Sequence, residues 1–258
     1  MIKKVMVYYI GALFITLILA GIIGGAGTTV GLNKITTGLL VLMGAQLGPA
    51  ISFLITRIIF RQEKFFINYK IKNTAFLLLS IIIPAVIILS SAGVITLLGK
   101  HYIESDIKGA ILLLFAISSF IGCFGEEIGW RGYLLPTFRE KHSMLISSLL
   151  TGLMWGAWHF MKIISYGVMP YLLFIPLIAA FGVIMGWIYF RTEHSLAYMV
   201  TFHLCINLVS GLLLTEREGI SFYIAGLLIS LVVILVIWFV DKEFFYIRKK
   251  DTGAVQGE

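Results

Sequence analysis

Eight long apolar runs, separated by short polar segments, occupy most of the chain. They centre on residues 5–25, 38–60, 74–98, 109–136, 144–164, 170–190, 195–214 and 220–240. A helix needs about 20 predominantly apolar residues to cross the hydrocarbon core of a bilayer. The runs therefore predict an all-α, polytopic membrane protein with about eight transmembrane helices.

The composition argues against a soluble fold. Hydrophobic residues make up 59% of the 258 residues and charged residues only 13%, whereas a soluble domain carries about 25% charged residues. Eight helices and their short connections account for nearly the whole length. We expect a single transmembrane domain over residues 1–250 and a short disordered tail over residues 251–258.

The formal net charge of +7 does not indicate a nucleic-acid partner, because the basic residues lie in short clusters between the apolar runs. In such positions they set the orientation of membrane helices. With a cytoplasmic N-terminus, the outward segments hold only Lys34, Lys100, Lys108, Lys162 and Arg217. This distribution favours a cytoplasmic location for both termini. We expect an integral protein of a bacterial cytoplasmic membrane, with the lipid bilayer as a partner.

A few strongly polar residues lie inside the apolar runs, where ionisable groups are costly and usually functional. The fourth, fifth and seventh runs contain Glu126, Glu127, Arg131, His159, His203 and Asn207. On a helix, Arg131 lies on the same face as Glu127 and can neutralise it. Glu126 points about 100° away around the helix and is left without a local cationic partner. We expect Glu127 and Arg131 to be supporting residues and Glu126 to be free to act as a general base.

These groups together suit the hydrolysis of a peptide bond inside a membrane. A carboxylate and an imidazole can activate water, and other donors can stabilise an oxyanion. We assign Glu126 and His159 to the water, and His203 and Asn207 to the oxyanion. His159 lies about 22 Å along its helix from the cytoplasmic end and His203 only about 13 Å. The helices must therefore be tilted or offset for these groups to meet.

A metal-dependent version of this chemistry stays open. Glu126, His159 and His203 would form a His₂Glu ligand set with one open position, as a divalent metal such as zinc requires. The compact helical HExxH signature of zinc proteases is absent from the sequence. No cofactor is certain from the sequence.

The three motifs resemble those of the intramembrane proteases that include type II CAAX prenyl endopeptidases and bacterial Abi or bacteriocin-processing proteins. EExxxR spans residues 126–131, an aromatic residue precedes His159 by four positions, and HxxxN spans residues 203–207. The resemblance implies an eight-helix fold and a membrane-associated peptide or protein substrate. It also implies that Glu126 and His159 activate water while His203 and Asn207 hold the oxyanion.

Two other functional classes stay open. Intramembrane glutamate, arginine and histidine residues also mark proton or ion paths, as in a small transporter. Transporters commonly contain internal repeats, and the sequence shows none. The second alternative is a catalytically idle membrane protein, such as an immunity or scaffolding factor that keeps the fold.

Overall fold

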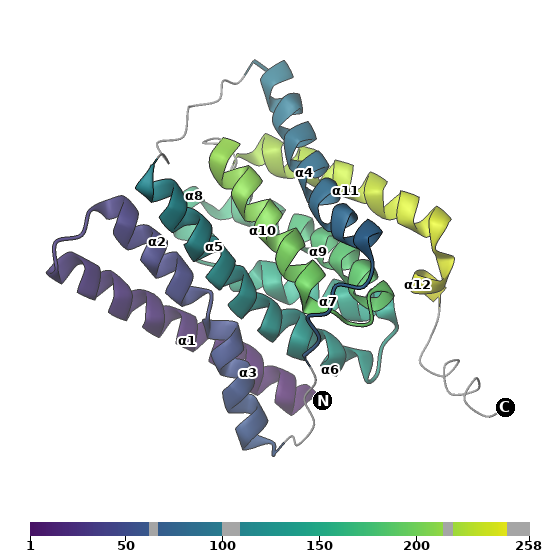
Figure 1. Ribbon diagram of the computed structural model, residues 1–258, viewed down its shortest axis with the longest axis horizontal. Coiled ribbons are helices and arrows are strands. Elements are labelled where there is room, and N and C mark those ends of the chain that lie inside the picture. Colours follow the sequence, from purple (N-terminus) through teal and green to yellow (C-terminus); the bar gives the residue numbers. More distant parts are fainter. Residues whose placement is uncertain (62–66, 100–108, 214–218, 247–258) are drawn as a thin grey trace.

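The computed structural model describes residues 1–61, 67–99, 109–213 and 219–246, and these are arranged as a bundle of helices (Figure 1). Within these ranges the extended backbone is limited to an isolated bridge between Asn68 and Ser195. The predicted all-α class is confirmed. The predicted disordered tail, residues 251–258, lies outside the described residues.

The eight predicted runs correspond to the main helices. Within the described residues, six segments are long and apolar enough to cross a membrane: α1 (Ile2–Thr29), α2 with α3 (Lys34–Ala45 and Gly48–Ile59), α4 (Thr74–Leu97), α5 to α6 (Ala110–Arg139), α9 (Val168–Arg191) and α11 (Ile220–Val240). Two shorter apolar helices, α7 (Met144–Trp158) and α10 (Leu196–Leu213), complete the eight. Short helices α8 (Lys162–Tyr166) and α12 (Lys242–Tyr246) follow α7 and α11.

Three of the predicted runs are not continuous α-helices. The second breaks between α2 and α3 at Gln46 and Leu47, and Pro49 lies in the first turn of α3, where its missing N–H costs no hydrogen bond. The fourth passes from α5 (Ala110–Gly129) through a π-helical turn, η1 (Trp130–Leu134), into α6 (Leu135–Arg139). Such turns are common at functional sites. In the fifth, α7 ends at Trp158, and His159 is the residue that caps it.

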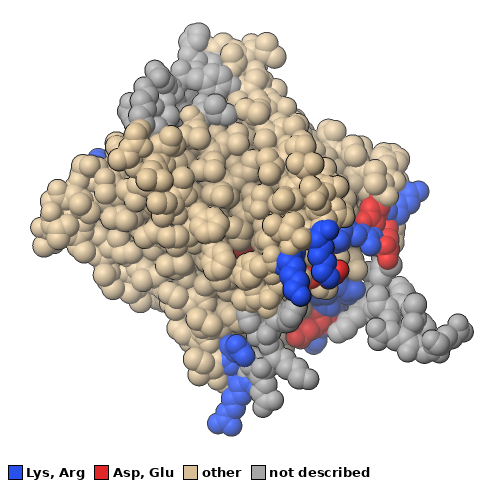
Figure 2. Space-filling view, viewed as in Figure 1, with Lys and Arg blue, Asp and Glu red and all other residues tan. Residues whose placement is uncertain are grey.

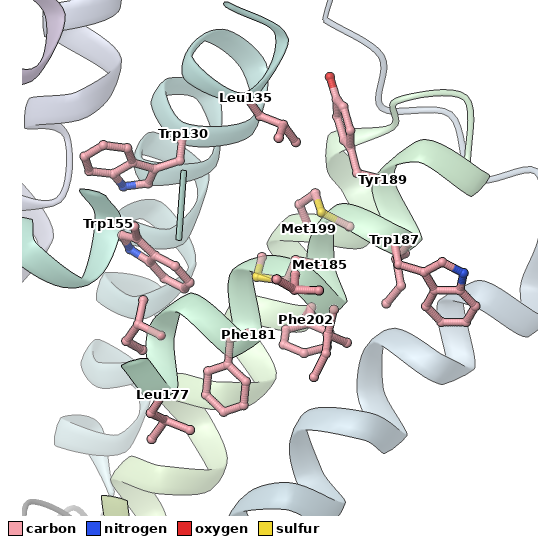
Figure 3. Close-up of a cluster of buried hydrophobic side chains, with 14 of the residues drawn as sticks. Trp130, Leu135, Trp155, Leu177, Phe181, Met185, Trp187, Tyr189, Met199 and Phe202 are labelled. Carbon is pink, nitrogen blue, oxygen red and sulfur yellow. The ribbon is translucent and has the colours of Figure 1, made fainter. Parts of the chain in front are cut away.

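Helix α9 forms the centre of the bundle, and every residue from 177 to 189 on it is buried. It crosses α7 closely, since a Cβ added to Gly182 would lie 2.6 Å from the Cα of Gly152. Small residues permit such approaches between membrane helices. Figure 3 shows the core around α9, with Trp130 and Trp155 at one side of it and Trp187 at the other.

Helix α5 lies between the α2–α3 pair and α10 (Figure 1). It therefore receives side chains from the N-terminal helices on one side and from the C-terminal half of the bundle on the other. By contrast, α1 buries only Tyr8, Ala12, Thr16 and Gly27. This arrangement makes α5 the helix around which a site can assemble.

Charged side chains gather at one end of the molecule, near the N-terminus and the start of α4, while most of the face shown in Figure 2 is uncharged. At this end, Asp241 accepts a hydrogen bond from Arg191 Nε at 2.6 Å and one from Trp187 Nε1 at 2.8 Å. Burial alone would raise the pKa of the Asp241 carboxyl, but these hydrogen bonds outweigh it and hold the pKa below its ordinary value. The distribution agrees with the orientation expected from the sequence, which stays a prediction.

Candidate active site

Glu127, Arg131 and His203 form a buried, charged cluster. Arg131 Nη1 donates to Glu127 Oε1 at 3.0 Å, four residues along the chain as the spacing predicts. The same oxygen lies 2.9 Å from Nδ1 of His203, which α10 contributes. Because an ionised carboxylate can only accept, the hydrogen must lie on Nδ1. Glu127 therefore orients the imidazole and leaves its Nε2 for other partners, a role that the sequence did not reveal.

Glu126 has quite different partners. Its Oε1 accepts a hydrogen bond from Gln46 Nε2 at 2.7 Å, and its Oε2 accepts one from Trp155 Nε1 at 2.6 Å. The carboxylate is completely buried. The expectation that Glu126 has no local cationic partner agrees with these contacts, and the two neutral N–H groups that bind it were not foreseen.

Trp155 connects the helices that carry the motifs. Besides its bond to Glu126, its ring lies 4.9 Å from the His203 ring and 4.2 Å from the Arg131 guanidinium. The His159 ring lies 6.2 Å from it, one turn further along α7. The large indole therefore lies near both histidine rings, and α5, α7 and α10 meet around it.

His159 lies at the end of α7 within a partly buried aromatic cluster. Its ring contacts those of Trp158 at 4.8 Å and Phe174 at 5.1 Å. Nδ1 lies 2.9 Å from the backbone oxygen of Trp155. A carbonyl oxygen accepts, so Nδ1 carries the hydrogen and Nε2 is the acceptor. Among the described residues, no hydrogen bond joins His159 to Glu126, although both contact Trp155.

Asn207 lies one turn after His203 on α10 and is half-buried. Its Nδ2 donates to the sulfur of Cys123 at 3.3 Å. A thiol is a weak acceptor, so this amide is held loosely and retains capacity for a stronger partner. Cys123 precedes Glu126 by one helical turn, which brings Asn207 to the same helix as the two carboxylates.

The arrangement does not fit a metal centre. Across the described ranges, no three histidine, cysteine, aspartate or glutamate side chains converge as metal ligands require. Both oxygens of Glu126 already accept N–H groups, and Nδ1 of His203 faces Glu127. The possible ligand set of Glu126, His159 and His203 is therefore not assembled in this structure.

Two members of the site, Gln46 and Trp155, had no role assigned from the sequence. Trp155 is the aromatic residue of a recognised motif, and its position four residues before His159 was a usable signal. Gln46 is a polar residue in the middle of an apolar run. That alone marks it as unusual in a membrane span, but it does not say which helix it contacts.

Comparison with known proteins supports the motif assignment. The family described as type II CAAX prenyl endopeptidase Rce1-like matches residues 108–209, a segment that contains EExxxR, His159 and HxxxN. The resemblance inferred from the motifs is therefore confirmed. A protein named CAAX prenyl protease 2, from Methanococcus maripaludis, is 27% identical over 205 residues, covering 70% of this chain and 69% of its own length.

Together these comparisons support an intramembrane protease in general terms. The long apolar helices described above make the chain an integral membrane protein. The part played by each polar side chain is a separate question, which the geometry of the cluster addresses.

Proposed function

We propose that this chain is an intramembrane endopeptidase that hydrolyses a peptide bond in a membrane-associated peptide or protein, with Glu126 as the general base. One observation carries the proposal: a fully buried carboxylate, Glu126, is bound by two neutral donors. The neighbouring carboxylate, Glu127, is bound by Arg131. A carboxylate without a cation retains the basicity that general-base catalysis needs.

Charge balance supports a second role, for His203. Two ionised carboxylates and Arg131 leave one uncompensated negative charge in a buried cluster, which is costly. A protonated His203 neutralises it. The imidazolium then donates from Nδ1 to Glu127 and from Nε2 to another acceptor. With the adjacent amide of Asn207, this gives two donors for an oxyanion.

His159 is proposed as the second group on the nucleophilic water. Its Nδ1 donates to the backbone of α7, so that Nε2 can accept a hydrogen from water. Next to it, Nε1 of Trp158 is buried without a hydrogen-bond partner among the described residues, as is Oε2 of Glu127. Unsatisfied buried polar groups usually find a partner, and the backbone of a bound peptide would supply one.

The proposed reaction proceeds in two steps. The oxygen of water attacks the carbonyl carbon of the peptide bond while Glu126 takes one proton from the water. The carbonyl oxygen becomes an oxyanion that accepts hydrogen bonds from His203 and Asn207. The carbon–nitrogen bond then breaks, and Glu126 passes its proton to the leaving amine. Glu126 returns to the carboxylate form, so no oxidant, reductant or covalent intermediate is needed.

Cleavage of membrane peptides by the purified protein in lipid nanodiscs tests this proposal. The name of the Methanococcus maripaludis relative, CAAX prenyl protease 2, makes prenylated CAAX peptides the first substrates to try, beside unmodified transmembrane peptides. We expect wild-type protein to release product and His159→Ala and His203→Ala to lose that activity. His142→Ala, which changes a histidine away from the cluster, serves as the matched control and should cleave normally.

The alternatives give different results. A transporter would change ion or solute flux in liposomes and release no peptide product, and an idle scaffold would do neither. Full cleavage by His203→Ala would contradict the proposed oxyanion site. Absence of cleavage with every lipidated and unmodified peptide would contradict the protease assignment.

A further inference from the structure

Gln46 lies outside residues 108–209, the segment matched by the Rce1-like family, yet it contacts the proposed base directly. It comes from the break between α2 and α3, 80 residues before Glu126, and is buried at 5% exposure. Gln46 keeps helical backbone angles and still donates its N–H to the Leu42 carbonyl, so it ends α2 as a helical residue. Both α2 and α3 pack against α5, which places the break beside the helix that carries Glu126.

A row of glycines on α5 makes this approach possible. A Cβ atom added to Gly122 would overlap the Gln46 amide. A Cβ atom added to Gly125 would lie 2.9 Å from the Gln46 backbone oxygen. Gly129 continues the row, where an added Cβ would lie 2.5 Å from Pro49 Cβ. The α2–α3 break therefore packs directly onto the backbone of α5, on the turn that carries Glu126.

The amide of Gln46 can adopt only one useful orientation. Nε2 faces Glu126 Oε1 at 2.7 Å, while the amide oxygen lies over Gly122 and has no hydrogen-bond partner among the described residues. The reverse orientation would place two acceptor oxygens against each other. A buried oxygen without a hydrogen bond is unfavourable. Gln46 therefore makes the bond from Nε2 to Glu126 while its own amide oxygen goes without a hydrogen bond.

We infer that Gln46 is a positioning residue that holds the Glu126 carboxylate ionised and in the orientation needed for catalysis. The space left by the missing Cβ of Gly122, which we call the Gly122 gap, lets the Gln46 amide reach it. The inference rests on the proposed function. Gln46 and Trp155 bind one oxygen each, which favours the charged form of the carboxylate without supplying a cation. A lysine or arginine in the place of Gln46 would suppress its basicity.

Kinetics of peptide cleavage across a pH range test this role. Gln46→Met keeps the size of the side chain and removes the donor. We expect kcat to fall about 10- to 100-fold, because the carboxylate is no longer held in the position from which it takes the proton, with little change in KM. The pH of half-maximal activity should rise, because loss of a donor disfavours the charged carboxylate. Gln46→Glu should recover activity as the pH falls to the value at which the new side chain is protonated and can donate, and should lose it again at the lower pH at which Glu126 is protonated.

Gly122→Ala tests the gap separately. It should reproduce the pH shift by displacing the amide, and a double variant with Gln46→Met should be no worse than Gln46→Met alone, because both changes remove the same contact. Gly38→Ala is the matched control: it also adds one methyl group to a membrane helix, but no atom lies within 4 Å of the new Cβ. Its profile should match that of wild type.

Infrared titration separates this inference from the proposed function, because it follows the Glu126 carboxyl group without any substrate. The Glu126 band is identified as the carboxyl band that is missing from the spectrum of Glu126→Gln. A shift of that band in Gln46→Met supports the coupling whether or not a peptide is cleaved. A shift without any cleavage by wild type would overturn the protease assignment alone. If Gln46→Met is folded and both its band and its pH profile match wild type, the positioning role is wrong.

Discussion

Glu126 and Glu127 are adjacent on α5 and equally buried, yet their surroundings differ. Glu127 is bound by Arg131 at 3.0 Å and lies 2.9 Å from His203, which makes it the centre of a charged cluster. Glu126 is bound by the neutral N–H groups of Gln46 and Trp155. The chain therefore presents one carboxylate bound by an arginine and one bound by neutral groups, a single residue apart.

The different partners of the two carboxylates indicate different roles for Glu127 and Glu126. When a buried carboxylate is paired with arginine, removal of one partner lowers the stability of the fold, because the other charge stays buried without compensation. A buried carboxylate with neutral donors is held in place but can still accept a proton. We therefore expect changes on the Glu127 side to lower stability and changes on the Glu126 side to lower activity.

The largest effect is expected for Arg131→Ala. It leaves Glu127 buried without its arginine, which typically costs about 3–5 kcal/mol, and it removes the cation stacked on Trp155. Thermal unfolding in detergent measures the loss. Lys72→Ala, which breaks the exposed pair with Glu193, should cost less than about 1 kcal/mol and is the control. A wild-type unfolding temperature for Arg131→Ala would show that the pair does not stabilise the fold.

A smaller effect is expected for Trp155→Phe. The ring contacts with Arg131 and His203 are retained in large part, but the bond to Glu126 Oε2 is lost. We expect turnover to fall about 10- to 100-fold, because the carboxylate loses one of the two contacts that hold it in position, with a small change in stability. Trp187→Phe removes an indole bond to Asp241 elsewhere and should leave turnover unchanged. Equal turnover in the two variants would contradict the role of Trp155.

The fold and the motif residues could be predicted because they depend on local features of the sequence. Hydropathy identifies each span within its own residues, and EExxxR places Glu127 and Arg131 on one helical face regardless of the rest of the bundle. The break at Gln46 and the π-helical turn at Trp130 were not predicted. Both interrupt runs whose hydropathy is continuous, so the pattern carries no signal for them.

The partners across helices could not be predicted, because they depend on how distant segments pack. Gln46 lies 80 residues from Glu126, and His203 lies 76 residues from Glu127. Helical spacing relates residues three or four apart, and it says nothing about which of two adjacent carboxylates receives a histidine from another helix. The sequence therefore indicated which residues are polar and buried, but not how they are paired.

The different roles of Glu126 and Glu127 are tested most directly by measuring peptide cleavage and thermal unfolding side by side for Glu126→Gln and Glu127→Gln. Both substitutions keep size and remove one charge. We predict that Glu126→Gln abolishes cleavage while unfolding near the wild-type temperature, and that Glu127→Gln unfolds at a clearly lower temperature because Arg131 and His203 lose their carboxylate. Wild-type cleavage by Glu126→Gln, or a stability loss confined to Glu126→Gln, would contradict the division of roles between the two residues.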